Sequence, residues 1–278
     1  MAEYFQFIED YCREEDTKRI NNQLLDMYTT WFRECFQKTK EYYPLEWPLN
    51  LPQLLTCTDA YLKSRIILFG KEANDTNSNI AFFNNALELY KQSVSYRYMA
   101  DIKNDQAKNT DFLKARKACA GLEHESFKDD SAAFKQFSGV LINNLNKVSY
   151  GGKRTLLEDR FKETIYRKFN YDGETENVFF HEFRILKPRK VIFLCGTDQG
   201  YIEHLKWHFG EKIGEEIGAC MTELSLDEGH LFCEGKSFCF AENKDIKYFY
   251  GYHPSARRLS SFREEYKKKL RDYYKIEL

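Results

Sequence analysis

The sequence lacks the features of membrane-spanning, exported and disordered proteins. No segment approaches the roughly 18 consecutive apolar residues that a membrane span needs. The start has neither the basic nor the apolar region of a secretory signal. Only five residues are proline and 42% are hydrophobic, which excludes a disordered chain. We therefore expect a soluble, cytoplasmic protein with no membrane partner, folded as one large domain or two small ones.

The cysteines lack the spacing of a metal or iron–sulfur site. There is no C-x-x-C pair, so the chain has no complete zinc-finger set of cysteines and histidines. Scattered cysteines in a chain without an export signal predict reduced, buried thiols. We therefore expect no metal and no other cofactor. The eight cysteines are Cys12, Cys35, Cys57, Cys119, Cys195, Cys220, Cys233 and Cys239.

The chain also lacks a strong charge of either sign, because its formal net charge is −1. No global basic field therefore points to a nucleic-acid partner. The C-terminal part differs, since residues 253–278 carry eight Lys or Arg against four acids. A local basic patch of this kind either binds phosphates or is simply a solvated helix face. Both interpretations stay open at this point.

Short apolar runs alternate with helical patterns along the chain. A run bounded by glycine or polar residues predicts a buried strand, and apolar residues three and four apart predict a helix. Strands are predicted at 65–70, 139–148, 190–196, 219–224 and 247–252, and a strand or a hairpin at 231–240. Helices are predicted at 16–40, 54–63, 77–91, 111–120, 131–137, 156–169, 178–186, 201–217 and 263–275. A helix remains an alternative at 139–148, and the prolines of 44–52 predict a linker.

Strands that alternate with helices are typical of βαβ units. We therefore expect an α/β fold with three layers, α/β/α, around a central, mainly parallel sheet of four to five strands. This domain covers 61–278, and residues 1–60 form an N-terminal helical extension. In such sheets ligands bind beyond the carboxyl ends of the strands, so Glu72 and Asp75 are candidate site residues by position. Solvated loop acids are the alternative.

Four segments occur in an order that resembles the uracil-DNA glycosylase superfamily. They are GKEAND at 70–75, the strand that ends near Asn144, HEFRILKPRKVIFLCG at 181–196, and HPSARR at 253–258. Members of that superfamily carry a glycine-led first motif with an acid or Asn, a middle Asn, an E-x-x-x-L-K-P-K segment and a terminal His-Pro-Ser loop. The resemblance covers residues 64–262. It implies a monofunctional DNA glycosylase, which flips a base out of DNA and hydrolyses its N-glycosidic bond to leave an abasic site.

The resemblance implies two catalytic residues. Glu72 matches the acid of the first motif and would orient or deprotonate water, as carboxylates do in glycoside cleavage. His253 matches the terminal histidine and would donate a hydrogen bond to the departing base. Lys71 is the only amine near these motifs, so strand cleavage through a Schiff base is not expected. His181 and His230 are interpreted as surface histidines.

The resemblance also implies base-binding residues. Asn144, or Asn143 if the register is shifted by one, would read the base edge with its amide. Phe82 or Phe83 would stack on the flipped base, unless it is simply a core residue. The uracil-specific branch has an aromatic residue where this chain has Asn74. In that branch the aromatic side chain excludes substituents on C5 of the base. We therefore expect a wider pocket and a modified, 5-substituted base.

DNA, single- or double-stranded, is the expected partner, and a monomer is expected. Pro254 and Ser255 would hold a backbone phosphate, and the loop that follows would wedge into the duplex. The full set of implied DNA contacts is Gly70, Lys71, Pro254, Ser255, Arg257, Arg258 and Leu259. Two alternatives remain: a non-catalytic module of the same fold that binds modified DNA or a protein partner, and a hydrolase of free nucleosides.

Overall fold

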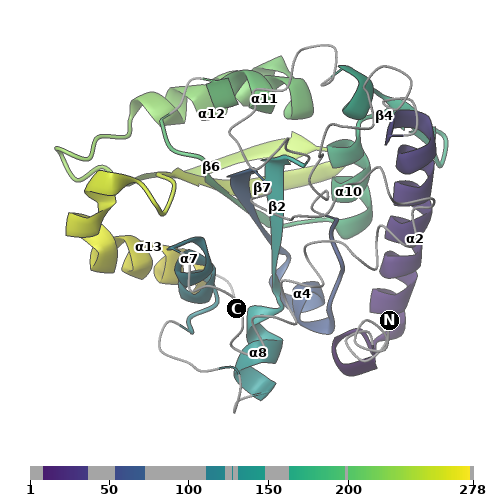
Figure 1. The fold of residues 1–278 in the computed structure, drawn as a ribbon, viewed down its shortest axis with the longest axis horizontal. Coiled ribbons are helices and arrows are strands. Elements are labelled where there is room, and N and C mark those ends of the chain that lie inside the picture. The colour runs from purple at the N-terminus through teal and green to yellow at the C-terminus, as the bar shows by residue number, and fades with distance from the viewer. Residues whose placement is uncertain are drawn as a thin grey trace, which may run out of the picture.

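The computed structural model describes residues 9–36, 54–72, 111–122, 127, 131–147, 163–197 and 200–275. Within these ranges a five-stranded sheet has helices on both faces, which confirms the expected three-layer α/β fold (Figure 1). The strand order is β2-β1-β5-β7-β6. Four neighbouring strands are parallel, and the edge strand β6 pairs antiparallel with β7. The strands are β1 (Ile66–Glu72), β2 (Val140–Asn146), β5 (Lys190–Leu194), β6 (Phe232–Phe240) and β7 (Asn243–Gly251).

Apolar runs lie in the parallel strands of this sheet because helices cover both of its faces. Every residue of β2 and of β5 is buried. The strand prediction for 139–148 is therefore confirmed over its helical alternative. The predicted strand at 219–224 is wrong, because helix α12 (Glu211–Thr222) runs through most of it. The single helix predicted at 201–217 is two helices, α11 (Gly200–Phe209) and α12, since Gly210 breaks the helix with a φ of 93°.

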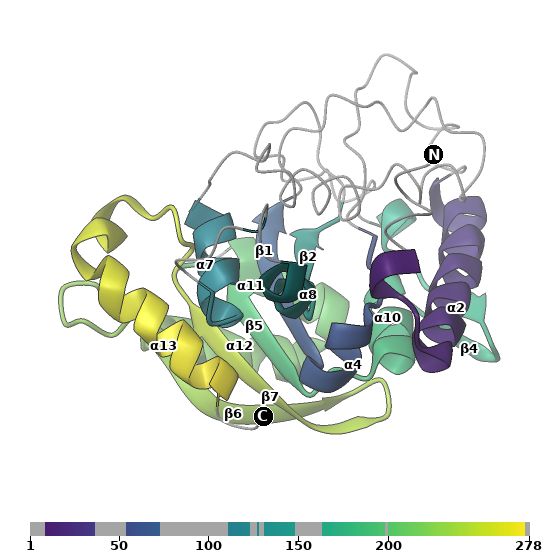
Figure 2. The ribbon, with the colours of Figure 1, turned by 90° about the horizontal axis from the view of Figure 1, so that it is seen from below.

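The two helical layers pack on opposite faces of the sheet (Figures 1 and 2). Phe69 of β1 contacts Phe179 of helix α10 (Val178–Leu186) and Phe209 of α11, so α10 and α11 lie on one face. On the other face, Phe249 of β7 stacks on Tyr273 of helix α13. This second layer consists of α7 (Asp111–Cys119), α8 (Ser131–Phe137) and α13 (Arg263–Lys275).

The N-terminal extension is part of the same hydrophobic core as the sheet domain. Helix α2 (Glu15–Trp31) continues as the short π-helix η1 (Phe32–Phe36) and packs on α10. The Nε1–H of Trp31 donates to the carbonyl of Ile165 at 2.8 Å. The short helix before the first strand is α4 (Asp59–Ser64).

Several predicted segments lie wholly or partly outside the described residues. These are the linker at 44–52, the helix at 77–91 and the first half of the helix at 156–169. The structure adds a hairpin that was not predicted, formed by β3 (Phe169–Tyr171) and β4 (Glu174–Glu176). No helix in the described ranges is long and apolar enough to cross a membrane.

The prediction of reduced thiols is wrong for one pair of cysteines. Cys220 of α12 and Cys233 of β6 form a disulfide, with Cα atoms 5.5 Å apart. Their partnership depends on α12 packing against β6, which their spacing in the sequence does not reveal. The other six cysteines are free thiols, and Cys239 is the exposed one among them. Within the described part of the chain, no three His, Cys, Asp or Glu side chains are grouped to hold a metal ion.

Candidate functional site

The carboxyl ends of the parallel strands meet at one edge of the sheet, where ligands bind in folds of this kind. Glu72 is the last residue of β1 and pairs in register with Asn146, the last residue of β2. Gly70 pairs with Asn144 two positions earlier. His253 follows β7 by two residues. The acid motif, the asparagine strand and the His-Pro-Ser loop therefore all lie at this edge.

One aromatic ring lies between the first motif and the terminal histidine. The half-buried ring of Phe112, on α7, stacks on the His253 ring with centroids 6.1 Å apart and planes 25° apart. The same ring lies so close to Gly70 that a Cβ there would be 3.0 Å from it. That Cβ would also lie 2.7 Å from Oδ1 of Asn144. Gly70 thus makes room for an aromatic ring and an amide next to the imidazole.

The turn after β7 determines which nitrogen of His253 carries the proton. The backbone N–H of Ser255 donates to Nδ1 at 3.3 Å, and the Ser255 hydroxyl lies 2.7 Å from the same atom. Because a backbone N–H can only donate, Nδ1 is an acceptor and we infer that the proton is on Nε2. The hydroxyl of Tyr266 on α13 donates to the carbonyl of Tyr252 at 2.7 Å and holds the start of this turn.

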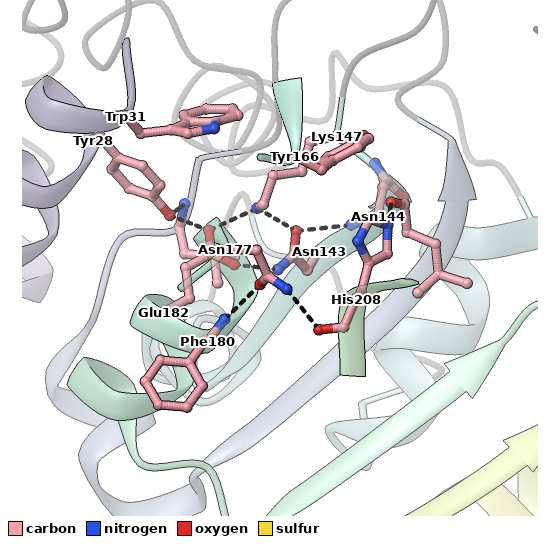
Figure 3. Close-up of polar contacts among 12 residues, drawn as sticks. Tyr28, Trp31, Asn143, Asn144, Lys147, Tyr166, Asn177, Phe180, Glu182 and His208 are labelled. Atoms are coloured by element: carbon pink, nitrogen blue, oxygen red, sulfur yellow. Dashed lines mark hydrogen bonds and ion pairs between the residues drawn. The ribbon is translucent and has the colours of Figure 1, made fainter. Parts of the chain in front are cut away.

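Asn143 and Asn144 point to opposite faces of β2, as successive strand residues do. Asn144 lies on the α7 face with Gly70, whereas Asn143 points towards α10 (Figure 3). The Nδ2 of Asn143 donates to Oε2 of Glu182 at 2.9 Å. Its Oδ1 accepts from the backbone N–H of Asn144 at 2.9 Å and from Nζ of Lys147 at 2.8 Å. Asn143 therefore has a structural role, and Asn144 is the candidate for reading a base.

Glu182, the acid of the E-x-x-x-L-K-P segment, is the centre of a fully buried network (Figure 3). Its Oε1 accepts from the hydroxyl of Tyr28 on α2 at 2.5 Å and lies 2.6 Å from Nζ of Lys147. Tyr28 in turn accepts the backbone N–H of Leu55 at 2.9 Å. Burial lowers the pKa of the Lys147 ammonium, and the nearby Glu182 carboxylate opposes that shift. The network connects α2, α10 and the end of β2 on the face of β2 opposite to Asn144.

The remaining predicted residues fall into three groups. Asn74, Asp75, Phe82 and Phe83 lie outside the described residues. The backbone of four others is described without their side chains: Lys71 and Glu72 in β1, and Arg257 and Arg258 in the 3-10 helix η3 (Arg257–Phe262). In the turn after His253, Pro254 is buried and Ser255 is exposed.

Two residues differ from their expected surroundings. Leu259 was expected to wedge into a duplex, but it is only 4% exposed and belongs to the hydrophobic core, so it is not available for insertion. His181 was expected at the surface, but it is fully buried, and its Nε2 lies 3.2 Å from the carbonyl of Phe169. Burial lowers the pKa of the His181 imidazole. His230 is exposed, as expected.

Phe112 and Asn146 were not among the predicted site residues. Phe112 lies on a helix about 40 residues after the first motif, and its position depends on how α7 packs. Asn146 had a usable signal, because residues 144 and 146 of a strand face the same side. Comparisons with protein-family models, with curated proteins and with solved structures found no match to this chain.

Proposed function

We propose that this protein is a monofunctional DNA glycosylase that hydrolyses the N-glycosidic bond of a uracil-like or 5-substituted base. The observation that carries the proposal is the row formed by Asn144, Gly70, Phe112 and His253 at the carboxyl edge of the sheet. An aromatic ring stacked on an imidazole, with an amide next to the same glycine, provides the groups that hold a flipped base by its edge and its face.

Each side chain has a defined role in this proposal. Glu72, at the end of β1, orients the attacking water and accepts its proton. The Nε2–H of His253 donates to the base oxygen, on which negative charge develops as the bond to the sugar breaks. Removing one such donor costs about 2.7–4 kcal/mol of transition-state stabilisation. Ser255 keeps that proton on Nε2 by occupying Nδ1.

The test is release of free bases from oligonucleotides that contain uracil or a 5-substituted pyrimidine, with mass spectrometry to identify each base. Glu72→Gln and His253→Ala should abolish release and leave DNA affinity within a few fold of the wild type. Affinity should fall as salt rises, because phosphate contacts release counterions. Release of bases from free nucleosides but not from DNA would favour the nucleoside hydrolase instead.

A non-catalytic module that binds modified DNA or a protein partner is the second candidate. One observation favours it: the Phe112 ring covers Gly70, in the space next to His253 that a base would enter. Phe112→Ala separates the two candidates. In an enzyme, the variant loses a stacking surface worth about 1–3 kcal/mol per base and binds the flipped base more weakly. In a binding module, neither the wild type nor the variant releases any base.

A further inference from the structure

Asn146 is a buried amide at the edge of the candidate site. It ends β2, is only 1% exposed, and pairs in register with Glu72. Its Oδ1 has no hydrogen-bond partner among the described residues. It follows Asn144 by two positions, so both asparagines lie on the same face of β2. Asn143, on the opposite face, is fully bonded within the Glu182 network.

A buried acceptor without a donor destabilises a protein, so nearly all such groups have partners. Asn143, in the same strand, does not carry this energetic cost, because both ends of its amide are hydrogen-bonded. Asn146 is the exception, and it pairs in register with Glu72, the proposed catalytic acid. An amide oxygen and a carboxylate are both acceptors, and a molecule that can donate to both at once is water.

We propose that Asn146 is a catalytic residue that holds the attacking water together with Glu72. This inference rests on the proposed glycosylase function and adds a residue to it. The water donates one hydrogen to Oδ1 of Asn146 and the other to Glu72, which directs an oxygen lone pair at C1′ of the sugar. The new C1′–O bond forms as the C1′–N bond breaks, and that electron pair leaves on the base. The water proton that faces Glu72 passes to its carboxylate.

The test compares Asn146→Leu with a matched control, Thr17→Val. Thr17 also has a fully buried oxygen without a partner in the described residues, but it lies on α2, away from the strand ends. Each substitution replaces an unsatisfied polar group by an apolar one of similar size. Both variants should therefore unfold at the same urea concentration as the wild type or a higher one.

The activities of the two variants should differ. Under saturating DNA, Asn146→Leu should lower kcat about 10²-fold, because the nucleophile is no longer positioned. Its KM and its preference between two bases should stay unchanged, since Asn144 still reads the base. Thr17→Val should keep the wild-type kcat. Asn146→Ala, which leaves space for a second water, should retain more activity than Asn146→Leu.

Two results would overturn the inference in different ways. An active wild type whose Asn146→Leu variant keeps its kcat, or loses activity only in proportion to its folded fraction, removes Asn146 from catalysis and leaves the proposed function intact. A wild type that releases no base from any DNA refutes the proposed function, and the role of Asn146 with it.

Discussion

The Nζ of Lys147 lies 2.6 Å from Oε1 of Glu182, and neither side chain is exposed to solvent. Three further polar groups complete this ion pair: the hydroxyl of Tyr28 and both ends of the Asn143 amide. The pair therefore connects the N-terminal helix to the strand that carries Asn144. A buried, fully bonded pair of this kind is sensitive to the loss of one member and tolerant of the loss of both.

Removing only the lysine should be strongly destabilising. Lys147→Met leaves the Glu182 carboxylate buried without its counter-ion, which should lower the free energy of unfolding by about 3–5 kcal/mol. The double variant Lys147→Met, Glu182→Gln carries no buried charge and should recover most of that loss. Urea unfolding of the two variants and of the wild type measures the difference. Equal destabilisation by the single and double variants would show that the charges are not coupled.

Adding one methyl group at Gly70 should disrupt the site. The new Cβ would lie 2.7 Å from Oδ1 of Asn144 and 3.0 Å from the Phe112 ring. Gly70→Ala should cost about 1–3 kcal/mol of stability through overpacking and should abolish base release by displacing both side chains. The control is Gly218→Ala in α12, where the three atoms nearest to the Cβ all belong to the side chain of Ile202, at 3.3–3.8 Å. That variant should keep wild-type activity.

Leu259 should behave as a core residue. Because it is buried, Leu259→Ala should lower the free energy of unfolding by about 2–5 kcal/mol. DNA affinity, measured by fluorescence anisotropy at a temperature where the variant is folded, should change little. Ser261→Ala, at an exposed position nearby, should change neither quantity. A Leu259→Ala variant with normal stability and lost DNA affinity would instead support a role in opening the duplex.

His181 should make stability depend on pH below neutrality. Burial lowers the pKa of its imidazole from the usual 6.5, so below that pH the unfolded chain binds a proton that the folded chain does not. The free energy of unfolding should therefore fall as pH decreases below about 6.5, by at most about 1.4 kcal/mol per pH unit for this one group. His181→Gln should show a shallower decrease between pH 6.5 and 5 in urea titrations. An unchanged slope would contradict this contribution.

Much of the fold could be predicted from local patterns. The apolar runs at 140–142 and 191–194 contain no polar residue, which is the pattern of strands covered on both sides, and their parallel order follows from the helices between them. Helix α10 ends where predicted because Pro188 follows two residues later. The break at Gly210 and the helix that replaces the predicted strand at 219–224 were missed, since a short apolar segment fits either structure until its packing partners are known.

The amino-acid sequence by itself determined that an acid, an asparagine and a histidine each lie at the end of a buried strand or just beyond it, and parallel strands bring such ends to one edge. The tertiary structure alone decided which of these side chains face one another. In the folded chain, Asn143 bonds to Glu182 and Asn144 lies next to Gly70. The ring of Phe112, on a helix far away in the sequence, stacks on His253. Leu259 is buried. The physical reason is that the face of a strand residue alternates with every position, so its surroundings depend on register and on the helical layer that covers it.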